Sequence, residues 1–229
     1  MPYESRISRR SHGTLLPDRL TSIDDTNRGD HYFLTESDRC LFFGEYFSGQ
    51  GYSGGPTNQL IHNYKIKPSA LLANPGRRRF KEEAIRDIAS GLRRVTDNAS
   101  LTQITFVPVP PSKTPGHPEY CDRLARTLRL AFAGLNADIR EMLMQTQSVE
   151  ADHESAERRN KEALAEITAV NEIALAQRVR DTIVLFDDVL TSGKHFKVCQ
   201  ECLQERLPRQ NIVGVFVARC VRPNPFAAA

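Results

Sequence analysis

Hydrophobic and polar positions along the chain alternate between two spacings, which predicts strands that take turns with helices. Four short runs of apolar, β-branched or aromatic residues are typical of buried strands: 40–48, 104–110, 182–186 and 212–218. Four longer segments, marked by helical spacing or by a helix-start signal, are predicted helices: 57–65, 77–95, 118–134 and 194–206. This alternation predicts βαβ units. The expected fold class is therefore α/β, with a mainly parallel central sheet flanked by helices.

Polar segments divide this pattern into regions. Residues 1–56 open with a stretch rich in Arg, Ser, Asp and Asn, and we interpret them as an N-terminal arm and a small hood or appendage. Residues 57–226 hold most of the alternating elements and are the predicted α/β domain. Within them, the polar segment 145–161 predicts a mobile loop that leads into a helix. The alanines at 227–229 have the character of an expression-vector scar.

Composition narrows the classes of protein. The 229 residues, 40% hydrophobic and 26% charged, suffice for one substantial globular domain with a small appendage. No apolar run approaches the roughly 20 residues that cross a bilayer, and no apolar block follows the arginines near the amino end. We therefore expect a cytoplasmic protein without a membrane partner. The net charge of +3 is modest for a nucleic-acid binder and fits a phosphate-bearing small molecule.

The five cysteines do not predict a disulfide framework, because their number is odd and their spacing is wide. Cys199 and Cys202 have the spacing of half a zinc site, but no second Cys or His pair stands at a matching distance. We interpret them as two small side chains on one face of a helix.

The most informative stretch covers residues 183–195. Four apolar residues predict a buried parallel strand that ends in two adjacent carboxylates, Asp187 and Asp188, at the sheet edge where α/β proteins bind ligands. The turn at 191–193 then opens a helix, and the N–H groups at a helix start favour an anion. One strip therefore combines acceptors for hydroxyl groups with a cradle for phosphate, as a phosphorylated sugar requires.

This stretch resembles the phosphoribosyl pyrophosphate (PRPP) signature of type I phosphoribosyltransferases, most closely in their ComF-like branch. The resemblance implies that Asp187 and Asp188 bind the ribose 2′- and 3′-hydroxyls. It also implies that the 5′-phosphate is held by a loop of five residues: Thr191, Ser192, Gly193, Lys194 and His195. His195 stands where the family usually has Thr or Ser. The alternative interpretation is a chance strand with an exposed Asp-Asp pair before an ordinary helix start.

A second segment resembles the pyrophosphate loop of ComF-like proteins. It consists of the Val-Pro-Val-Pro strand end at 107–110 and the Ser112 and Lys113 that follow. Ser112 and Lys113 supply a hydroxyl and a cation, which suit pyrophosphate. Without the family, the segment is a proline-rich loop between a strand and a helix.

A third segment, residues 145–160, is similar to a family loop that closes over the substrate and excludes water. By this resemblance Arg158 and Arg159 would meet the pyrophosphate, and the alternative is a solvated, charged helix start. The whole resemblance covers about residues 61–221. The four-cysteine zinc module that usually begins ComF-like proteins has no counterpart in the sequence.

The implied activity is transfer of a phosphoribosyl group from PRPP to an unidentified nitrogen acceptor, with release of pyrophosphate. Mg²⁺ is the implied cofactor, held mainly through PRPP, and Asp187, Asp188 and Lys113 are the implied catalytic residues. One of the two carboxylates would be the protein's own contact to Mg²⁺. Several aromatic residues before the α/β domain are candidates to stack on the acceptor, although such residues often belong to the core: Phe33, Phe42, Phe43, Tyr46 and Tyr52.

Two alternatives stay open, because a fold does not fix a function. One is a non-catalytic sensor of PRPP or a nucleotide, which His195 favours. The other is a ComF-like accessory protein in DNA uptake, although no basic stripe with interleaved aromatic residues indicates a nucleic-acid partner. A homodimer is the default expectation for the oligomeric state.

Overall fold

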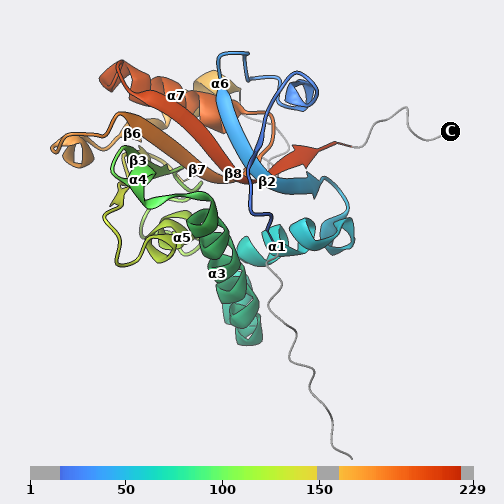
Figure 1. The fold of residues 1–229 in the computed structure, drawn as a ribbon. Coiled ribbons are helices and arrows are strands. Elements are labelled where there is room, and N and C mark those ends of the chain that lie inside the picture. The colour runs from blue at the N-terminus through green and yellow to red at the C-terminus, as the bar shows by residue number, and fades with distance from the viewer. Residues whose placement is uncertain (1–15, 149–159, 223–229) are drawn as a thin grey trace, which may run out of the picture.

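The computed structural model describes residues 16–148 and 160–222, and a six-stranded sheet forms its centre (Figure 1). The order of strands across this sheet is β1 (Thr21–Ser22), β2 (Arg39–Phe47), β8 (Asn211–Val221), β7 (Thr182–Leu190), β3 (Ile104–Pro108) and β4 (Asp138–Ile139). All neighbouring strands are parallel except β1 and β2. The predicted α/β class with a mostly parallel central sheet is confirmed.

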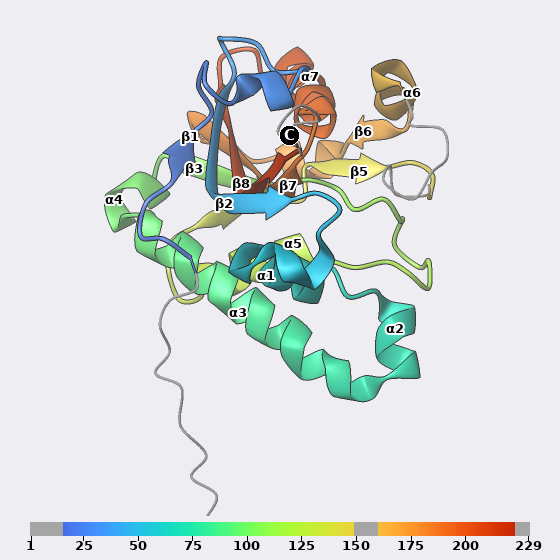
Figure 2. The ribbon, with the colours of Figure 1, turned by 90° about the vertical axis from the view of Figure 1, so that its right-hand side faces the viewer.

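Helices cover both faces of the sheet (Figures 1 and 2). On one face lie α1 (Pro56–Tyr64), α3 (Arg78–Val95) and α5 (Arg123–Ala131), and on the other lie α6 (Lys161–Glu166) and α7 (Lys194–Arg206). The remaining elements are α2 (Pro68–Ala73), α4 (Asn98–Leu101) and an antiparallel pair of strands, β5 (Leu143–Gln145) and β6 (Thr168–Val170). None of the helices in the described ranges is long and apolar enough to cross a membrane.

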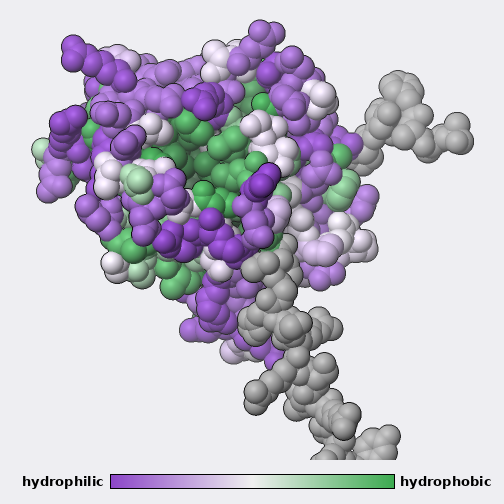
Figure 3. Space-filling view, in the orientation of Figure 1, coloured by the Kyte–Doolittle hydropathy of each residue, from purple (hydrophilic) through white to green (hydrophobic). Residues whose placement is uncertain are grey.

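The hydrophobic core lies between the sheet and these helices. Ile183 and Leu185 of β7 are completely buried, and α3 buries Ile85 and Ile88 as its helical spacing predicts. Phe80, in the first turn of the same helix, remains 38% exposed. The space-filling view shows hydrophobic residues concentrated in a central hollow on one face of the molecule, ringed by hydrophilic residues (Figure 3).

The strand order locates one point where the direction of winding reverses. After β3 the chain continues to β4 on one side of it, whereas after β7 it continues to β8 on the opposite side. β3 and β7 are therefore neighbours whose connections lead away from each other. In open α/β sheets, a crevice forms outside the carboxyl ends of such strands, and ligands bind there.

The segment before residue 57 contributes to the sheet itself. β2 pairs with β8 in parallel along most of its length, and Phe42 and Phe43 are buried in the core. The predicted boundary at residue 57 is therefore wrong in so far as it separates β2 from the α/β domain. The physical reason is that the long edge of β8 needs a partner, and β2 satisfies its backbone hydrogen bonds.

Two predicted element boundaries also change. The helix predicted at 118–134 begins at Arg123, because residues 114–120 form turns, closed by the backbone N–H groups of His117 and Tyr120. The strand predicted at 182–186 extends to Leu190, because its ladder with β8 continues to that residue. Asp187 and Asp188 therefore lie within the strand instead of following it.

Candidate functional site

A cavity of about 470 Å³ lies at the carboxyl ends of β3 and β7, at the point where the winding reverses. Its volume falls within the range of roughly 300–1,000 Å³ that is usual for small-molecule pockets. The cavity opens there because β3 ends at Pro108, opposite Phe186, while β7 continues beyond it. On its β3 side, the last part of β7 therefore has no paired strand, and its carboxylates face the crevice.

Most of the residues that the sequence predicts for the site line this cavity. Asp187, Asp188 and all five residues of the loop 191–195 line it, and so does Ser112 from the loop after β3. Lys113 follows Ser112 in the chain but is not among the lining residues. Arg158 and Arg159 lie outside the described residues, whereas the adjacent Asn160 reaches the cavity wall.

Gly193 shapes the turn from β7 into α7. Its φ is +86°, a left-handed conformation that residues with a side chain rarely adopt. A Cβ atom there would also lie 2.9 Å from side-chain atoms of Leu34. Because glycine contributes no side-chain cap to the 13-residue helix α7, the N–H groups of its first turn are suited to an anion.

The segment just before β2 packs against this turn from the amino-terminal half of the chain. The backbone N–H of Phe33 donates to the carbonyl oxygen of Ser192 at 3.0 Å, and the buried ring of His31 hydrogen-bonds the carbonyl oxygen of Thr191 through Nδ1. Burial holds the pKa of His31 below its usual value, so the ring is neutral near pH 7. A neutral Nδ1–H donor and a backbone amide thus fix the loop that sequence reasoning assigned to phosphate.

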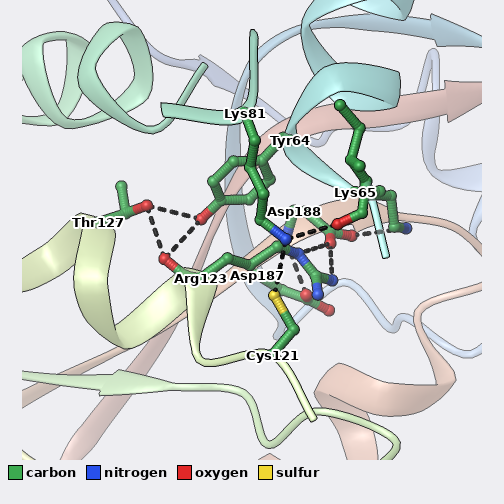
Figure 4. Close-up of polar contacts among 9 residues, drawn as sticks. Tyr64, Lys65, Lys81, Cys121, Arg123, Thr127, Asp187 and Asp188 are labelled. Atoms are coloured by element: carbon green, nitrogen blue, oxygen red, sulfur yellow. Dashed lines mark hydrogen bonds and ion pairs between the residues drawn. The ribbon is translucent and has the colours of Figure 1, made fainter. Parts of the chain in front are cut away.

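Asp188 is buried and forms ion pairs with two cations from the face of the sheet that carries α1 and α5 (Figure 4). Nζ of Lys65, at the end of α1, donates to one of its oxygens at 3.0 Å. Arg123, at the start of α5, donates to the other oxygen through both Nε, at 3.1 Å, and Nη2. Burial by itself would raise the pKa of Asp188, but Lys65 and Arg123 outweigh it and hold that pKa well below its usual range.

Asp187 has different surroundings, because successive side chains of a strand point to opposite faces. Its Oδ1 accepts the backbone N–H of Asp188 at 2.7 Å, and the side chain is partly open to the cavity. Burial, followed by repulsion from the negative Asp188, raises the pKa of Asp187 to about 6, while the nearby His195 opposes the rise. This carboxyl therefore takes up a proton at a higher pH than an ordinary aspartate does.

Arg123 is itself held by a small polar cluster (Figure 4). Its guanidinium lies 5.6 Å from the ring centroid of Tyr64, whose hydroxyl donates to the carbonyl oxygen of Arg123 and lies 2.8 Å from Oγ1 of Thr127. Beside it, Nζ of the buried Lys81 donates to Sγ of Cys121 at 3.1 Å. Burial alone would raise the pKa of Cys121, but Arg123 and Lys81 lower it below its usual value.

Sequence reasoning missed the cations of this site. Lys65 stands at the end of a predicted helix and Arg123 on the polar side of another, where charged residues usually face solvent. Only the fold places the end of α1 and the start of α5 near the end of β7, where Lys65 and Arg123 both reach Asp188. The weak signal was the position of Lys65 directly after the apolar residues of α1.

The candidate aromatic residues differ in their positions, and Tyr46 lies against His62 with ring centroids 5.9 Å apart. Phe42 and Phe43 belong to the core, and the exposed Tyr52 stacks on His62 with ring centroids 4.8 Å apart. Phe33 lines the cavity together with Tyr32, which the sequence did not single out. One predicted aromatic candidate is therefore in the pocket, and a second ring accompanies it.

The cavity thus joins a left-handed glycine turn at a helix start, one partly open carboxylate, and a buried carboxylate that holds two cations. The open carboxylate can accept hydrogen bonds from hydroxyl groups of a ligand. The helix start and the two cations can bind anionic groups of the same ligand. No protein-family model matches the chain, and no curated protein matches it. The chemistry of the site is therefore the basis for a functional proposal.

Proposed function

We propose that this protein is a phosphoribosyltransferase with a type I fold, which binds PRPP with Mg²⁺ and transfers the phosphoribosyl group to a nitrogen acceptor. The observation that carries the proposal is the position of Asp187 next to the loop 191–195, in one pocket at the carboxyl ends of β3 and β7. A sugar phosphate needs an acceptor for its hydroxyl groups close to a binding site for its phosphate. Residues 187–195, which are continuous in the chain, supply both.

The individual roles follow from the contacts. The loop 191–195 and the first turn of α7 bind the 5′-phosphate. Asp187 accepts the ribose hydroxyls, because its carboxylate borders the cavity while Asp188 already binds Lys65 and Arg123. We therefore assign Asp188 a positioning role: it directs two cations toward the pocket, where they attract the pyrophosphate together with Ser112.

The residues present fit a magnesium ion that is held mainly by its ligand. Mg²⁺ commonly uses one or two carboxylates together with substrate phosphates. Asp187 offers one such carboxylate at the cavity, and the described residues contain no cluster of three or more His, Cys, Asp or Glu side chains for a metal. When bound, the ion would neutralise charge on the departing pyrophosphate.

The chemistry of the transfer needs no nucleophile from the protein. The lone pair of the acceptor nitrogen forms the new bond to C1 of the ribose, the C1–O bond to pyrophosphate breaks, and its electron pair leaves with pyrophosphate. The protein residues orient the two reactants and stabilise the charge that develops on the leaving group, Lys65 and Arg123 from within the pocket. Lys113, the other implied cation, follows Ser112 but does not line the cavity.

Calorimetric titration of PRPP with Mg²⁺ tests the proposal. We expect binding by the wild type, loss of binding in Asp187→Asn, and unchanged binding in Asp181→Asn, which removes a carboxylate just before β7. Asp181 is a suitable control because its side chain is 83% exposed in a surface pair with Arg178. A folded wild type that does not bind PRPP contradicts the proposal.

A non-catalytic PRPP sensor is the second candidate function. The ion pairs that Asp188 forms with Lys65 and Arg123 favour it. Because Lys65 and Arg123 occupy both oxygens of Asp188, only one of the two signature carboxylates is positioned to contact the ribose. An assay for pyrophosphate release in the presence of nitrogen bases separates the candidates. Release identifies an enzyme, whereas PRPP binding without release by any base identifies a sensor.

A further inference from the structure

Lys81 of α3 is a buried cation whose partners include a cysteine (Figure 4). Its side chain belongs to a residue that is 3% exposed, and Nζ donates to the carbonyl oxygen of Ile66 at 2.5 Å and to Sγ of Cys121 at 3.1 Å. Within residues 16–148 and 160–222, Lys81 forms no ion pair with a carboxylate. Because a lysine is almost never fully buried unless it is paired, the thiolate of Cys121 is the group that supplies the matching negative charge.

Cys121 is accessible from a second, small cavity. The residue is partly exposed and lines a space of about 30 Å³, which the loop after β3 borders through Pro110 and Pro111. A single water needs roughly 10–15 Å³ of such space. The cavity therefore has room for a molecule of two heavy atoms, such as hydrogen peroxide.

The other cysteines have different surroundings. Cys40, Cys199 and Cys220 are buried, whereas Cys202 is partly exposed like Cys121. Burial, followed by the negative charges of nearby glutamates, raises the pKa of Cys202. For Cys121, burial by itself would have the same effect, but the neighbouring cations outweigh it and lower the pKa. Because the thiolate is the nucleophilic form of cysteine, these surroundings favour reaction at Cys121.

We propose that Cys121 is a site of reversible oxidation, at which hydrogen peroxide converts the thiolate paired with Lys81 to a sulfenic acid. Redox-sensitive cysteines combine thiolate character with access, and this position has both. The inference goes beyond the proposed phosphoribosyl transfer and does not depend on it.

The oxidation balances with hydrogen peroxide as the oxidant. The thiolate sulfur attacks one peroxide oxygen, so that an S–O bond forms and the O–O bond breaks. The leaving hydroxide takes a proton from the ammonium group of Lys81 and departs as water. Sulfur loses two electrons and the peroxide gains them. The products, a sulfenic acid and a neutral amine, carry no charge, which suits their burial.

A small thiol reverses the change. It condenses with the sulfenic acid to form a mixed disulfide and water, and a second thiol then releases the cysteine by exchange. The returned proton restores the ammonium group of Lys81.

Two reactions on the folded wild type at neutral pH test the inference, each followed by mass spectrometry of the cysteine peptides. Iodoacetamide measures how fast each thiol reacts as a thiolate. Hydrogen peroxide followed by dimedone, which captures sulfenic acids, locates the oxidation. Cys202 is the internal control, because it is also partly exposed but its thiol faces the carbonyl oxygen of Thr168 at 3.9 Å.

Three variants complete the test. Lys81→Met removes the buried ammonium group, and Arg86→Met is its matched control, because it removes an exposed cation from the same helix. Cys121→Ser removes the thiol itself. Circular dichroism establishes that each variant is folded.

We expect Cys121 to react with iodoacetamide at least about 10-fold faster than Cys202, and to carry the dimedone adduct. Lys81→Met should slow both reactions at Cys121 by about 3- to 10-fold, since Arg123 remains beside the thiol. Arg86→Met should match the wild type, and Cys121→Ser should give no adduct at position 121. In concentrated urea the two cysteines should react at similar rates, because their difference arises from the fold.

A wild-type Cys121 that reacts no faster than Cys202 would overturn the inference. Unchanged rates at Cys121 in a folded Lys81→Met would overturn it too. If Lys81→Met does not fold, the comparison of the two cysteines in the wild type decides by itself. None of these measurements uses PRPP, so failure of the transferase proposal and failure of this inference are separate results.

Discussion

Asp187 and Asp188 are neighbours in β7, yet their side chains leave the strand on opposite faces and meet opposite electrostatic conditions. Asp188 lies among cations that keep it ionised, with its side chain 5% exposed. Asp187 lies beside that negative charge, with a pKa raised to about 6. The difference arises from the face of the sheet that each side chain meets, and it leads to distinct predictions for the two positions.

Replacement of Asp188 by Asn should destabilise the protein by about 2–4 kcal/mol, because Lys65 and Arg123 would remain largely buried without their anion. Urea unfolding at pH 7 measures this change in the free energy of unfolding. The control Asp181→Asn removes a carboxylate whose ion pair is almost fully exposed, and it should change the same quantity by less than about 0.5 kcal/mol. Equal effects of the two substitutions would show that the ion pairs of Asp188 contribute nothing net.

Replacement of Asp187 by Asn should have the opposite effect on the unliganded protein. The folded-state pKa of Asp187, about 6, lies above its unfolded value near 3.9, so folding favours the protonated carboxyl, and ionisation destabilises the fold as the pH rises through 6. Asp187→Asn should therefore be more stable than the wild type by about 1–3 kcal/mol at pH 7.5 and nearly equal to it at pH 4. Unfolding curves at both pH values measure the difference; a difference of the same size at pH 4 would contradict the assigned pKa.

At the scale of elements, the turn between β7 and α7 depends on contact with a segment about 160 residues earlier in the chain. The carbonyl oxygens of Thr191 and Ser192 accept hydrogen bonds from His31 and Phe33, and Leu34 occupies the space beside Gly193. The anion cradle is thus shaped by two elements together, the helix start and the segment before β2.

Gly193→Ala tests this contact. The substitution should destabilise the protein by about 2–4 kcal/mol, since it adds left-handed strain to a close approach between the new Cβ and Leu34. Gly134→Ala is the matched control: its φ is +75°, but no heavy atom lies within 4 Å of the added Cβ. It should cost only the strain, about 1–2 kcal/mol, in the same unfolding measurement. Equal losses would show that Leu34 moves aside freely.

At the scale of the whole molecule, a further buried ion pair, besides those of Asp188, links the two halves of the chain. Asp38, just before β2, has a side chain that is 2% exposed, and Nζ of Lys197 in α7 donates to its oxygens at 2.9 and 3.0 Å. The backbone N–H of Thr35 donates to the same carboxylate at 2.7 Å. Burial by itself would raise the pKa of Asp38, but these partners outweigh it and lower that pKa.

This link predicts how the molecule responds to acid. Because the folded-state pKa of Asp38 lies below its unfolded value near 3.9, its stabilising contribution is complete above that pH and is lost as the pH falls through the folded-state pKa. Between pH 5 and pH 3, the free energy of unfolding should therefore fall less in Asp38→Asn than in the wild type. Urea titrations across this range provide the measurement, and Asp181→Asn should follow the wild type. A parallel decline in Asp38→Asn would exclude this origin of the acid response.

Periodicity predicted the main elements well because it reports local physics. The spacing of apolar residues within β7 or α3 decides strand or helix before any distant contact forms, and both elements occur where the pattern places them. The boundaries that changed depend on partners: β7 continues past Phe186 because β8 accompanies it, and β2 joins the sheet because β8 has an edge to fill. Hydrogen bonding between strands distant in sequence has no local signature.

By itself, the sequence determined the alternating α/β pattern and the strip from Ile183 to His195, because a strand, a tight glycine turn and a helix start are contiguous in the chain. Only the tertiary structure decided what that strip meets. Lys65, Arg123, Tyr32 and Arg222 come from four separate segments, and folding brings them to one cavity at the end of β7. The electrostatic character of a carboxylate depends on distances of a few ångströms between such segments, so Asp187 and Asp188 could not be told apart until the chain had folded.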